Sequence, residues 1–556
     1  MFNLAVIHEA IASAVPDREC LVFRERRLTW EQVTDRTRRL ADVLRRHGLG
    51  CREERAGLSN WESGQDHVAL YLYNGNEYME GMLGCFKART VPINVNYRYV
   101  DEELEYLFGN SDARAVIYHS VFAPTLARIR DKLPNVSLWL QVADESGGPL
   151  LPGALDYEQA LAEATPELPP GDLSGDDLYI LYTGGTTGMP KGVLWRQEDI
   201  LRAALYPGQV DTVTGIVDRA KAGDIRSLPA PPFMHGAAHW AAFNIWHVGG
   251  TVVVQSKPRL LDPHDLWSTV ERERVNTVTI VGDAFGRPLA DQLRERDYDL
   301  SSLKLLTSGG AILTAALKRE FLELLPEVRI LDALGSSESG AQATQFSSRD
   351  EKTTTGDFAL GPDNLVLKED LSGAVVPGSG EQGWLVRRGR LPLGYYKDAE
   401  KTARTFPVVD GIRYVVPGDR AQLEADGTLR LLGRDSVTIN TGGEKVFAEE
   451  VEHALKHHPA VYDAVVVPTP HARWGQQVTA VVRLRDGEAA SEDELRATAS
   501  EHVAPYKLPK AFVFVAEIAR SPSGKPDYGW ARATALRGLG IEAASRARAS
   551  RPARPA

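Results

Sequence analysis

Residues 178–192 read LYILYTGGTTGMPKG, an apolar run followed by a loop of glycines and threonines and then a lysine. The apolar run predicts a strand, and the glycines allow a turn that exposes backbone N–H groups. The threonine hydroxyls add hydrogen-bond donors, and Lys191 adds positive charge. These groups together predict a site for an oligophosphate, formed by Thr183, Gly184, Gly185, Thr186, Thr187, Gly188 and Lys191.

This loop departs from the Walker pattern of P-loop NTPases. Pro190 precedes the lysine where that pattern needs glycine, and Gly192 follows it where the pattern needs serine or threonine. Judged by composition alone, an ordinary turn is an equally good interpretation. The choice between the two therefore depends on the rest of the chain.

The composition limits the classes of function. The chain has 556 residues, too many for one ordinary core, so at least two domains are expected. Apolar residues make up 43% and charged residues 25%, as in globular proteins that are not embedded in a membrane. The formal net charge of −11 argues against nucleic acid or an anionic membrane as a partner, because both need concentrated positive charge.

The cysteines and the N-terminus bear on location. Cys20, Cys51 and Cys85 form no Cys-x-x-Cys pair, so neither a disulfide framework nor a zinc site follows. The first 16 residues have no basic segment before their apolar stretch, so no secretory signal is expected. No run of about 18 apolar residues could span a bilayer. We expect a cytoplasmic protein.

Helix-like and strand-like segments alternate over several hundred residues. Apolar residues recur at helical spacing over Leu28–Gly48, which predicts an amphipathic helix. A strand is expected at Val68–Tyr73 and a helix at Tyr78–Ala88. Further strands are expected at Ala115–Tyr118, Thr251–Gln255, Thr277–Val281 and Leu303–Ser308. This alternation predicts an α/β domain of mainly parallel, helix-covered sheets.

The pattern changes after Gly433. Helices are expected at Ala448–His458 and Glu492–Val503, and strands at Val461–Pro468, Gln477–Leu484 and Ala511–Ala516. A small α+β domain of about a hundred residues follows from this pattern. We therefore predict a large domain over 1–433, a small domain over 434–536, and a disordered tail over 537–556, which is rich in Ala, Arg, Gly and Pro.

The loop at 178–192 closely resembles the phosphate-binding signature of the adenylate-forming superfamily, which contains acyl-CoA synthetases, nonribosomal adenylation domains and firefly-type luciferases. Gly184 stands where that superfamily usually has serine. Further motifs follow in the same order across about residues 10–535. The resemblance implies a small, mobile C-terminal domain and a two-step reaction with ATP, Mg²⁺ and coenzyme A. A carboxylate first forms an acyl-adenylate, and a thiol then displaces AMP.

A second motif lies in residues 331–340, which read LDALGSSESG and resemble the superfamily's Tyr-Gly-x-Thr-Glu motif. Glu338 supplies a hard oxygen ligand for Mg²⁺, and Ser337 a hydroxyl for the α-phosphate. Leu334 replaces the aromatic residue that would stack on adenine. By resemblance Glu338 and Ser337 are catalytic, and Ala333, Leu334 and Gly335 contact the nucleotide.

Two further segments resemble the superfamily's substrate pockets. Residues 308–311, SGGA, follow a strand, so Gly309, Gly310 and Ala311 are expected beside the adenine, with Gly310 and Gly335 also facing the acid. His235 matches a position that lines the acyl pocket, and Trp240 extends that wall. A buried core helix is an equally good interpretation of Trp240 and Phe243.

The remaining motifs resemble the ribose site, the hinge and the small domain. Asp419 and Arg434 would bind the ribose hydroxyls. The superfamily's hinge corresponds to Asp435–Ser436. The glycine-rich turn after it would approach the pantetheine through Gly442, Gly443 and Lys445. Lys525 matches the C-terminal catalytic lysine, which neutralises the charge that develops as pyrophosphate leaves.

Within the superfamily, Ile93–Val100 and Gly188–Ile200 resemble an actinobacterial branch of fatty-acid and steroid side-chain CoA ligases. This predicts a hydrophobic acid substrate: a fatty acid, a steroid side chain or a polycyclic terpenoid acid. Three alternatives stay open: an enzyme of one half-reaction only, motivated by Gly184, Leu334 and Ser436; a non-catalytic binding protein; and, ranked last, luciferase-like oxygenation. A carrier protein in place of coenzyme A, and a homodimer, also stay open.

Overall fold

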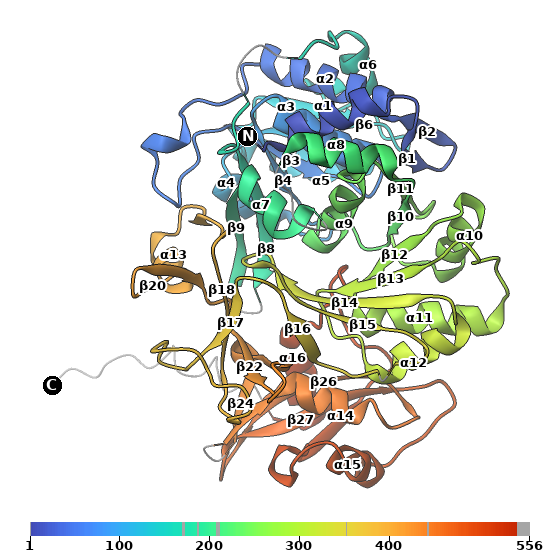
Figure 1. Ribbon diagram of the computed structural model, residues 1–556, viewed down its shortest axis with the longest axis vertical. Helices are drawn as coiled ribbons and strands as arrows, with labels where there is room; N and C mark the ends of the chain where they lie inside the picture. Colours follow the sequence, from blue (N-terminus) through green and yellow to red (C-terminus); the bar gives the residue numbers. More distant parts are fainter. Residues whose placement is uncertain are drawn as a thin grey trace. The chain divides into compact units, whose positions relative to one another are not determined.

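The computed structural model describes residues 2–168, 173–185, 188–206, 212–351, 353–441 and 444–541 (Figure 1). The chain divides into two compact units. The large unit comprises Met1–Leu367 and Val386–Pro417, and the small unit comprises Lys368–Leu385 and Gly418–Ala556. By its contacts the small unit thus begins before the predicted hinge at Asp435. The functional boundary at 433/434 stays a prediction.

The main sheet of the large unit has the strand order β2-β1-β11-β10-β12-β13-β14-β15-β16. Every pair from β1 to β14 in this order is parallel, whereas β2, β15 and β16 pair antiparallel with their neighbours. The strands are β1 (Glu19–Phe23), β2 (Arg26–Thr29), β10 (Arg226–Pro229), β11 (Thr251–Val254), β12 (Thr277–Ile280), β13 (Leu305–Gly309), β14 (Arg329–Ser336), β15 (Gly340–Ser347) and β16 (Asp357–Leu360).

Two further sheets complete the large unit. One is entirely parallel, in the order β4-β3-β5-β6-β7, and the other is antiparallel, in the order β19-β9-β8. Their strands are β3 (His67–Tyr71), β4 (Val91–Asn94), β5 (Ala113–His119), β6 (Leu138–Val142), β7 (Leu155–Asp156), β8 (Leu178–Gly185), β9 (Gly188–Arg196) and β19 (Gly394–Tyr395). The predicted α/β class with mainly parallel sheets is confirmed. The short strands β17 (Asn364–Leu367) and β21 (Ile412–Val415) pair with β18 (Gly383–Arg388), and β20 (Val408–Val409) pairs with β21. The boundary between the two units falls within β18, after Leu385.

The helices of the large unit cover these sheets, and α10, α11 and α12 lie beside the β12–β14 part of the main sheet (Figure 1). The helices are α1 (Leu4–Ala14), α2 (Trp30–Arg46), α3 (Asn76–Lys87), α4 (Asp101–Asn110), α5 (Ala123–Ile129), α6 (Tyr157–Ala162), α7 (Gln197–Ile200), α8 (Val213–Ala222), α9 (Gly236–Trp246), α10 (Pro263–Glu273), α11 (Gly282–Glu295), α12 (Ala315–Leu324) and α13 (Ala399–Thr405). The predicted amphipathic helix is α2, which begins with a capping box between Thr29 and Gln32.

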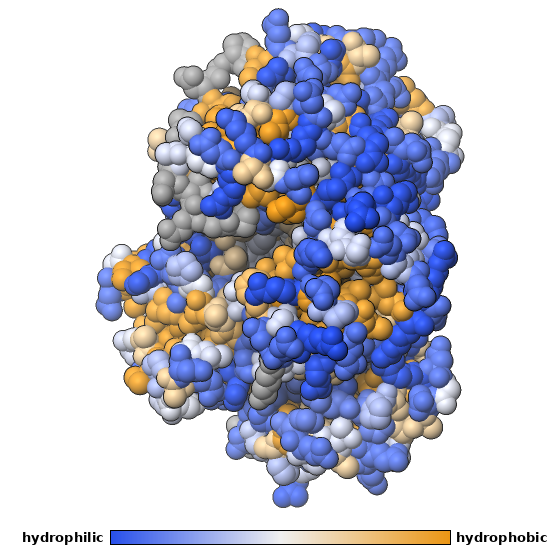
Figure 2. Space-filling model, turned by 45° about the vertical axis from the view of Figure 1, so that its right-hand side comes forward, coloured by the Kyte–Doolittle hydropathy of each residue, from blue (hydrophilic) through white to orange (hydrophobic). Residues whose placement is uncertain are grey.

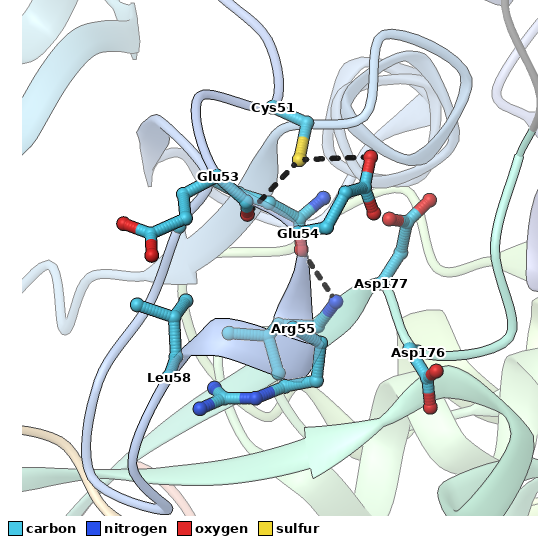
Figure 3. Close-up of a pocket in the computed structure, with 10 residues that line it drawn as sticks. Cys51, Glu53, Glu54, Arg55, Leu58, Asp176 and Asp177 are labelled. Carbon is cyan, nitrogen blue, oxygen red and sulfur yellow. Dashed lines mark hydrogen bonds between the residues drawn. The ribbon is translucent and has the colours of Figure 1, made fainter.

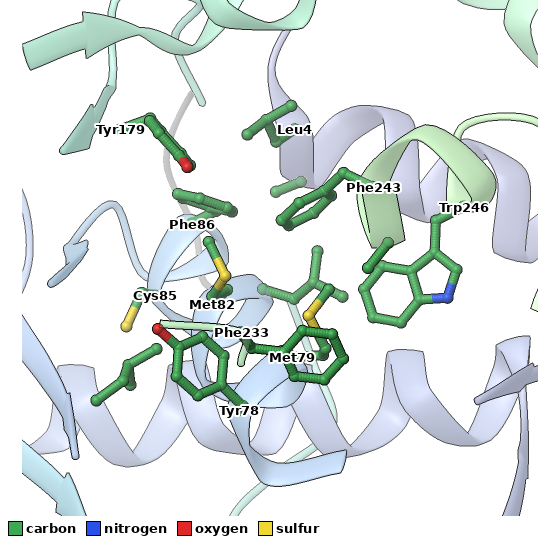
Figure 4. Packing of buried hydrophobic residues seen from close by; sticks show 14 of the residues in the cluster. Leu4, Tyr78, Met79, Met82, Cys85, Phe86, Tyr179, Phe233, Phe243 and Trp246 are labelled. Carbon is green, nitrogen blue, oxygen red and sulfur yellow. The ribbon is translucent and has the colours of Figure 1, made fainter. Parts of the chain in front are cut away.

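Close packing of α2 against α3 explains a glycine in the middle of α3. A Cβ atom at Gly84 would lie 2.6 Å from Cδ2 of Leu40 in α2. The lost helix propensity of a glycine is therefore offset by the contact that it permits. Figure 4 shows the core that results, where Met79, Met82 and Phe86 of α3 meet aromatic side chains from β8 and α9.

The small unit is built on a sheet in the order β25-β24-β27-β26, with β28 paired to β27. The hairpin β22 (Asp419–Leu423) and β23 (Leu429–Arg434) precedes this sheet. The remaining elements are β24 (Thr438–Thr441), β25 (Glu444–Phe447), β26 (Val461–His471), β27 (Gly475–Leu484), β28 (Ala511–Phe514), α14 (Ala448–Leu455), α15 (Glu492–Ser500) and α16 (Tyr528–Gly538). The predicted α+β character is confirmed.

The predicted tail overlaps α16, because that helix continues to Gly538. Residues 542–556 of the predicted tail lie outside the described residues.

Charged and polar side chains cover much of the face drawn in Figure 2, with apolar side chains gathered in separate patches between them. Among the described residues, no helix combines the length and apolar character needed to cross a bilayer.

Candidate active site

The predicted phosphate loop is the tip of the β8–β9 hairpin. Thr183 pairs with Lys191, and Gly185 pairs with Gly188, so the two strands converge on the tip. Gly184 is exposed, and a Cβ atom there would meet nothing within 4 Å. Thr186 and Thr187 lie outside the described residues. The hairpin thus presents the described part of the loop at the end of two well-paired strands.

Lys191 forms an ion pair with Asp398, and the Lys191 side chain remains 37% exposed. Asp398 also caps α13 by accepting a hydrogen bond of 2.9 Å from the backbone N–H of Lys401. Although partial burial opposes it, Lys191 and that N–H hold the pKa of Asp398 below its usual value. Asp398 therefore holds the Lys191 side chain beside the loop.

The turn between β14 and β15 carries the two predicted catalytic residues of the large unit, Ser337 and Glu338. The hydroxyl of Tyr395 donates a hydrogen bond of 2.9 Å to Oε1 of Glu338. The indole N–H of Trp195 donates a hydrogen bond of 2.9 Å to the carbonyl oxygen of Ser337. Since Trp195 lies in β9 and Tyr395 in its partner strand β19, the phosphate hairpin and this turn are held together.

Glycine is required at the base of this turn. A Cβ atom at Gly335 would lie 2.3 Å from the carbonyl oxygen of Gly340, too close for any side chain. Burial and the nearby Glu338 carboxylate raise the pKa of Tyr395, so its hydroxyl stays a donor at neutral pH. The close backbone approach at Gly335 and the hydrogen bond from Tyr395 thus both constrain the turn.

The residues predicted beside adenine come together at the ends of β13 and β14. Gly309 pairs in register with Ala333, and a Cβ atom at Gly309 would lie 3.1 Å from the Ala333 carbonyl oxygen. Gly310 follows with φ +84°, a conformation that favours glycine, and Ala311 follows Gly310. Because Gly309 and Gly310 carry no Cβ atom, a planar ring could approach this backbone closely. Leu334, next to Ala333, pairs with Ala343 and is partly buried.

Glu338 fits the role of a magnesium ligand. Its carboxylate is partly exposed, and the Tyr395 hydroxyl orients one oxygen. Across the described residues, no group of three His, Cys, Asp or Glu side chains could hold a metal ion. Mg²⁺ in nucleotide enzymes is usually held by one or two carboxylates together with substrate phosphates, so a single carboxylate suits that mode of binding.

The predicted acyl wall lies at α9, which begins directly after His235. The Trp240 indole N–H donates a hydrogen bond of 2.8 Å to the Tyr179 hydroxyl. Tyr179 in turn bonds Nε2 of His239, whose Nδ1 lies 2.6 Å from the carbonyl oxygen of Phe233. Burial lowers the pKa of His239 to about 4, so the ring is neutral. This relay holds the partly buried Trp240 ring in place.

The sequence allows Phe243 to lie either in the wall of the acyl pocket or in the core. The structure places it in the core, 1% exposed and beside Phe86 and Trp246 (Figure 4). Trp240 differs because it stays partly exposed on the same helix. Phe243 therefore belongs to the core, whereas Trp240 remains a candidate for the acyl wall.

In the small unit, the predicted ribose residues are neighbours. Asp419 and Arg434 pair across the β22–β23 hairpin, and Nε of Arg434 lies 3.3 Å from Oδ1 of Asp419. Asp419 is buried, 5% exposed. The predicted hinge residue Asp435 accepts a hydrogen bond of 3.1 Å from Arg420. The ion pair fixes the Asp419 carboxylate at the end of its strand.

The turn predicted to approach pantetheine is described only in part, since Gly442 and Gly443 lie outside the described residues. Lys445, on the far side of the turn, is exposed, and its Nζ lies 3.3 Å from Oε1 of Glu369. Glu369 also accepts a hydrogen bond of 3.0 Å from Arg420. These contacts lower the pKa of Glu369, first through Arg420 and then through Lys445.

Lys525 is exposed at the end of a tight turn. The backbone N–H of Ser521 bonds the Lys525 carbonyl oxygen at 2.9 Å, and Gly524 has φ +75°. Arg520 braces the turn by bonding the Gly524 carbonyl oxygen at 2.8 Å and Asp463 at 2.8 Å. Although burial opposes ionisation, Lys456 and Arg520 lower the pKa of Asp463 to about 2. The backbone that carries Lys525 is thus fixed by an ion pair.

The structure brings the predicted site residues together in two sets, one in each unit. The large unit holds the phosphate loop, the β14–β15 turn, the adenine surface and α9, and the small unit holds the ribose pair, Lys445 and Lys525. Sequence reasoning missed Tyr395, Trp195 and Asp398. The signal available for them was weak, since each is a single aromatic or acidic residue whose partner lies far along the chain.

Two sequence profiles match this chain. That of the AMP-binding enzyme family matches residues 8–396, and that of the AMP-binding enzyme C-terminal domain matches residues 450–525. The medium-chain acyl-CoA ligase Mig of Mycobacterium avium is 51% identical over 544 residues, which cover 97% of this chain and 99% of that protein. A 3-oxocholest-4-en-26-oate–CoA ligase of Rhodococcus rhodochrous is 42% identical and covers 95% of each chain. The predicted resemblance is confirmed.

Solved structures match as well. The anthranilate CoA ligase AuaEII in complex with anthranoyl-AMP has a TM-score of 0.81 at 23% identity, covering 97% of this chain and 98% of that chain. ATP-bound MatB from Rhodopseudomonas palustris has a TM-score of 0.80 at 22% identity, covering 97% and 100%. At these identities the likeness concerns the fold alone. It confirms the predicted fold class, and the mobility of the small domain stays a prediction.

Proposed function

Because the chain belongs to the AMP-binding enzyme family, we propose that it activates a medium- or long-chain fatty acid or a steroid side-chain acid with ATP and transfers the acyl group to coenzyme A. It is an acid–thiol ligase. The observation that carries the proposal is the pair of hydrogen bonds from Trp195 and Tyr395, which join the phosphate hairpin to the turn that holds Ser337 and Glu338.

In the first step, the substrate carboxylate attacks the α-phosphorus of ATP and pyrophosphate leaves. We assign the phosphates to the hairpin tip and to Lys191, which would exchange Asp398 for a phosphate. The Ser337 hydroxyl would donate to the α-phosphate, and Lys525 would neutralise the charge that develops on it. Glu338 would hold Mg²⁺, which supplies charge neutralisation to the phosphates when bound.

Base and ribose binding follow from the other motifs. The backbone surface of Gly309, Gly310, Ala311 and Ala333 would take the adenine ring, with Leu334 as an aliphatic contact in place of an aromatic one. The two carboxylate oxygens of Asp419 would accept hydrogen bonds from the ribose hydroxyls, with Arg434 as a further donor. Gly335 and Gly310 would face the acid.

In the second step, the thiolate of coenzyme A attacks the acyl carbon of the adenylate and AMP leaves. The mixed anhydride makes this step easier, because AMP is a far better leaving group than oxide. We assign the pantetheine contact to Gly442, Gly443 and Lys445. Rotation about Asp435–Ser436 would bring this turn to the adenylate in place of Lys525, as domain alternation requires.

The acid would lie along α9, between His235 and the Trp240 ring. The hydrogen bond from Trp240 to Tyr179 supports this, because it orients a large apolar surface that stays partly exposed. The hydrophobic class of acid is supported by the two relatives that match along nearly the whole chain. The predicted homodimer and cytoplasmic location stay predictions.

The test follows AMP, pyrophosphate and acyl-CoA together in one reaction with ATP, Mg²⁺ and coenzyme A. The acids would be octanoate, palmitate, 3-oxocholest-4-en-26-oate, a polycyclic terpenoid acid and, as a polar comparison, malonate. We expect equal amounts of all three products with the hydrophobic acids and none with malonate. Thioester formed only from a supplied acyl-adenylate, without pyrophosphate release, would contradict the complete reaction and favour the single half-reaction.

A further inference from the structure

A charged cavity of about 660 Å³ lies in the large unit, apart from the phosphate loop. It is lined chiefly by four arginines and three aspartates: Arg55, Arg196, Arg390, Arg413, Asp176, Asp199 and Asp363. Arg196 ends β9, whereas Gly188 begins it beside the phosphate loop. At about 3.3 Å per residue, the eight steps between them span about 26 Å. The cavity therefore lies apart from the phosphate loop, and because successive side chains of a strand point to opposite faces, Arg196 points away from the face of β9 on which Trp195 bonds Ser337.

Two of the arginines share one buried carboxylate. Asp199 is only 5% exposed on its side chain; one of its oxygens lies 2.7 Å from Nε of Arg196 and the other 2.9 Å from Nη1 of Arg390. Arg196 also bonds Asp176 at 2.9 Å. A guanidinium has five N–H donors, so each of these arginines has further donors to offer. Asp199 thus holds the two planar groups as a fixed pair.

The other two arginines are bound through neutral groups. Nη1 of Arg413 donates to the carbonyl oxygen of Pro392 at 2.7 Å, and its Nη2 donates to Leu393. Nη1 of Arg55 donates to the carbonyl oxygen of Glu62 at 2.6 Å. Carbonyl oxygens orient a guanidinium but do not neutralise its charge. Burial lowers the pKa of both arginines from the usual value, against a partial opposing effect of nearby carboxylates, which include Asp176 for Arg55 and Asp199 for Arg413.

The residues that line the cavity carry a net positive formal charge, although the net charge of the whole chain is negative. Four arginines against three aspartates leave a formal charge of +1 among the lining residues, while the whole chain carries −11; Glu198, outside the lining, lies 3.8 Å from Arg390. A concave site of opposite sign to its surroundings concentrates counter-ions. Figure 3 shows Arg55, Leu58 and Asp176 in the smaller pocket that shares these residues with the cavity, with Glu53 and Glu54 on its far side.

We propose that this cavity binds the phosphate group of a nucleotide-sized anion, as a second anion site of the enzyme. The forked donors of arginine match the oxygens of a phosphate. A volume of about 660 Å³ lies within the usual range for small-molecule sites and exceeds what a single inorganic ion fills. The ligand carries at least one dianionic phosphate, and a nucleoside part would occupy the remaining volume.

The test measures binding by calorimetry to the full-length enzyme, with no acid or coenzyme A present. The probes are inorganic phosphate, pyrophosphate, AMP and adenosine 3′,5′-bisphosphate, each titrated with and without a saturating acyl-sulfamoyl adenosine, which carries no phosphate and occupies the proposed catalytic site. We expect one site per chain that persists with the analogue present. Since no turnover is involved, this result does not depend on whether the proposed ligase activity is found.

The variant Arg55→Gln/Arg413→Gln removes the two arginines whose hydrogen bonds go to backbone carbonyl oxygens. We expect it to weaken binding of the tightest probe at least about tenfold, because charge-assisted hydrogen bonds are lost. The control is Arg404→Gln, an arginine outside the cavity whose side chain is 71% exposed. It should bind like the unchanged enzyme. Equal affinity in the double variant and the control would overturn the proposal.

A second pair of variants guards against misfolding of the first. Asn60 lines the cavity and is exposed. Asn60→Lys should tighten binding several-fold and Asn60→Asp should weaken it by a similar factor, since the two substitutions place opposite charges at the rim. Tighter binding of adenosine 3′,5′-bisphosphate or AMP than of phosphate supports the nucleotide-sized ligand. No binding of any of the four probes, or affinities that ignore both substitutions at Asn60, would overturn it.

Discussion

Trp195 and Ser337 lie 142 positions apart in the chain, yet the indole N–H of Trp195 donates a hydrogen bond of 2.9 Å to the Ser337 carbonyl oxygen. Trp195 is fully buried in β9, the strand that begins at the phosphate loop. Ser337 precedes Glu338 in the β14–β15 turn. One hydrogen bond therefore sets the spacing between two segments to which we assign parts of the same ATP molecule.

Trp195→Phe keeps an aromatic ring and removes this donor. We expect kcat/KM for ATP to fall about tenfold, since positioning of the Ser337–Glu338 turn is lost, and the free energy of unfolding to fall by about 1–3 kcal/mol. The matched control is Trp267→Phe, because Trp267 is also fully buried and donates a 2.9 Å hydrogen bond to a carbonyl oxygen, that of Leu289. It should lose similar stability and keep its activity. Equal loss of activity in both variants would remove the positioning role.

Gly184→Ser restores the residue that the superfamily usually has in the phosphate loop. The structure leaves open space there, so the hydroxyl can be added without a clash. We expect the KM for ATP to fall about threefold, because one more donor faces the phosphates. Gly335→Ser is the opposite case, since its Cβ would lie 2.3 Å from a carbonyl oxygen, and it should abolish adenylation. Initial rates of pyrophosphate release, measured at varied concentrations of ATP, test both predictions.

Lys525→Ala should abolish acyl-adenylate formation and spare the reaction of a supplied acyl-adenylate with coenzyme A. The reason is that charge on the α-phosphate develops only in the first step. The control is Arg532→Ala, an exposed cation on the neighbouring helix α16. Separate assays of pyrophosphate release and of thioester formation give the two rates. Unchanged adenylation in the lysine variant would exclude Lys525 from the mechanism.

Local patterns sufficed for much of the fold. The strands expected at Thr251–Gln255 and Thr277–Val281 are β11 and β12, each one residue shorter at its end. The spacing of apolar residues and the composition are enough to predict such strands, because a parallel strand that is buried on both faces needs a continuous apolar run. The same reasoning could not assign Phe243 and Trp240, since both are apolar on one helix and only packing separates them.

The parts of the site that sequence reasoning missed depend on tertiary contacts. Tyr395 reaches Glu338 because β19 pairs with β9, a pairing that no local pattern specifies. The motif that contains Glu338 could be predicted because its glycine and acid have fixed local roles. Its orienting hydroxyl is a tyrosine in a short strand of two residues, and its signal is too weak to distinguish from an ordinary buried aromatic residue.

We expect the Glu449 carboxyl to make the stability of the small unit depend on pH. Its Oε2 is shielded from solvent, and a Cβ atom at Gly433 would lie only 2.6 Å from it. Burial, and then the like charge of Glu452, raise the pKa of Glu449 to about 8, against a partial opposing effect of Arg434. The folded chain thus keeps a proton that the unfolded chain releases near pH 4.5.

The sign of the effect follows from proton binding. Below about pH 4.5 both states are protonated and Glu449 makes no difference. As the pH rises from there to about 8, only the unfolded state loses its proton, so the free energy of unfolding falls by up to about 1.4 kcal/mol per pH unit. Above about pH 8 the penalty is constant. Glu449→Gln cannot ionise, so its advantage over the unchanged enzyme should grow between pH 5 and 8 and then level off.

Urea unfolding of the full-length enzyme at pH 5 to 9 measures this difference. The readout should be hydrogen exchange in β26 and β27, because these strands form the core of the small unit. Glu501→Gln, on the exposed surface of the same unit, is the control and should match the unchanged enzyme at every pH. A constant offset for Glu449→Gln across the whole range would mean that the carboxyl is already ionised in the folded state, and that its environment in the small unit is more polar than the packing against Gly433 implies.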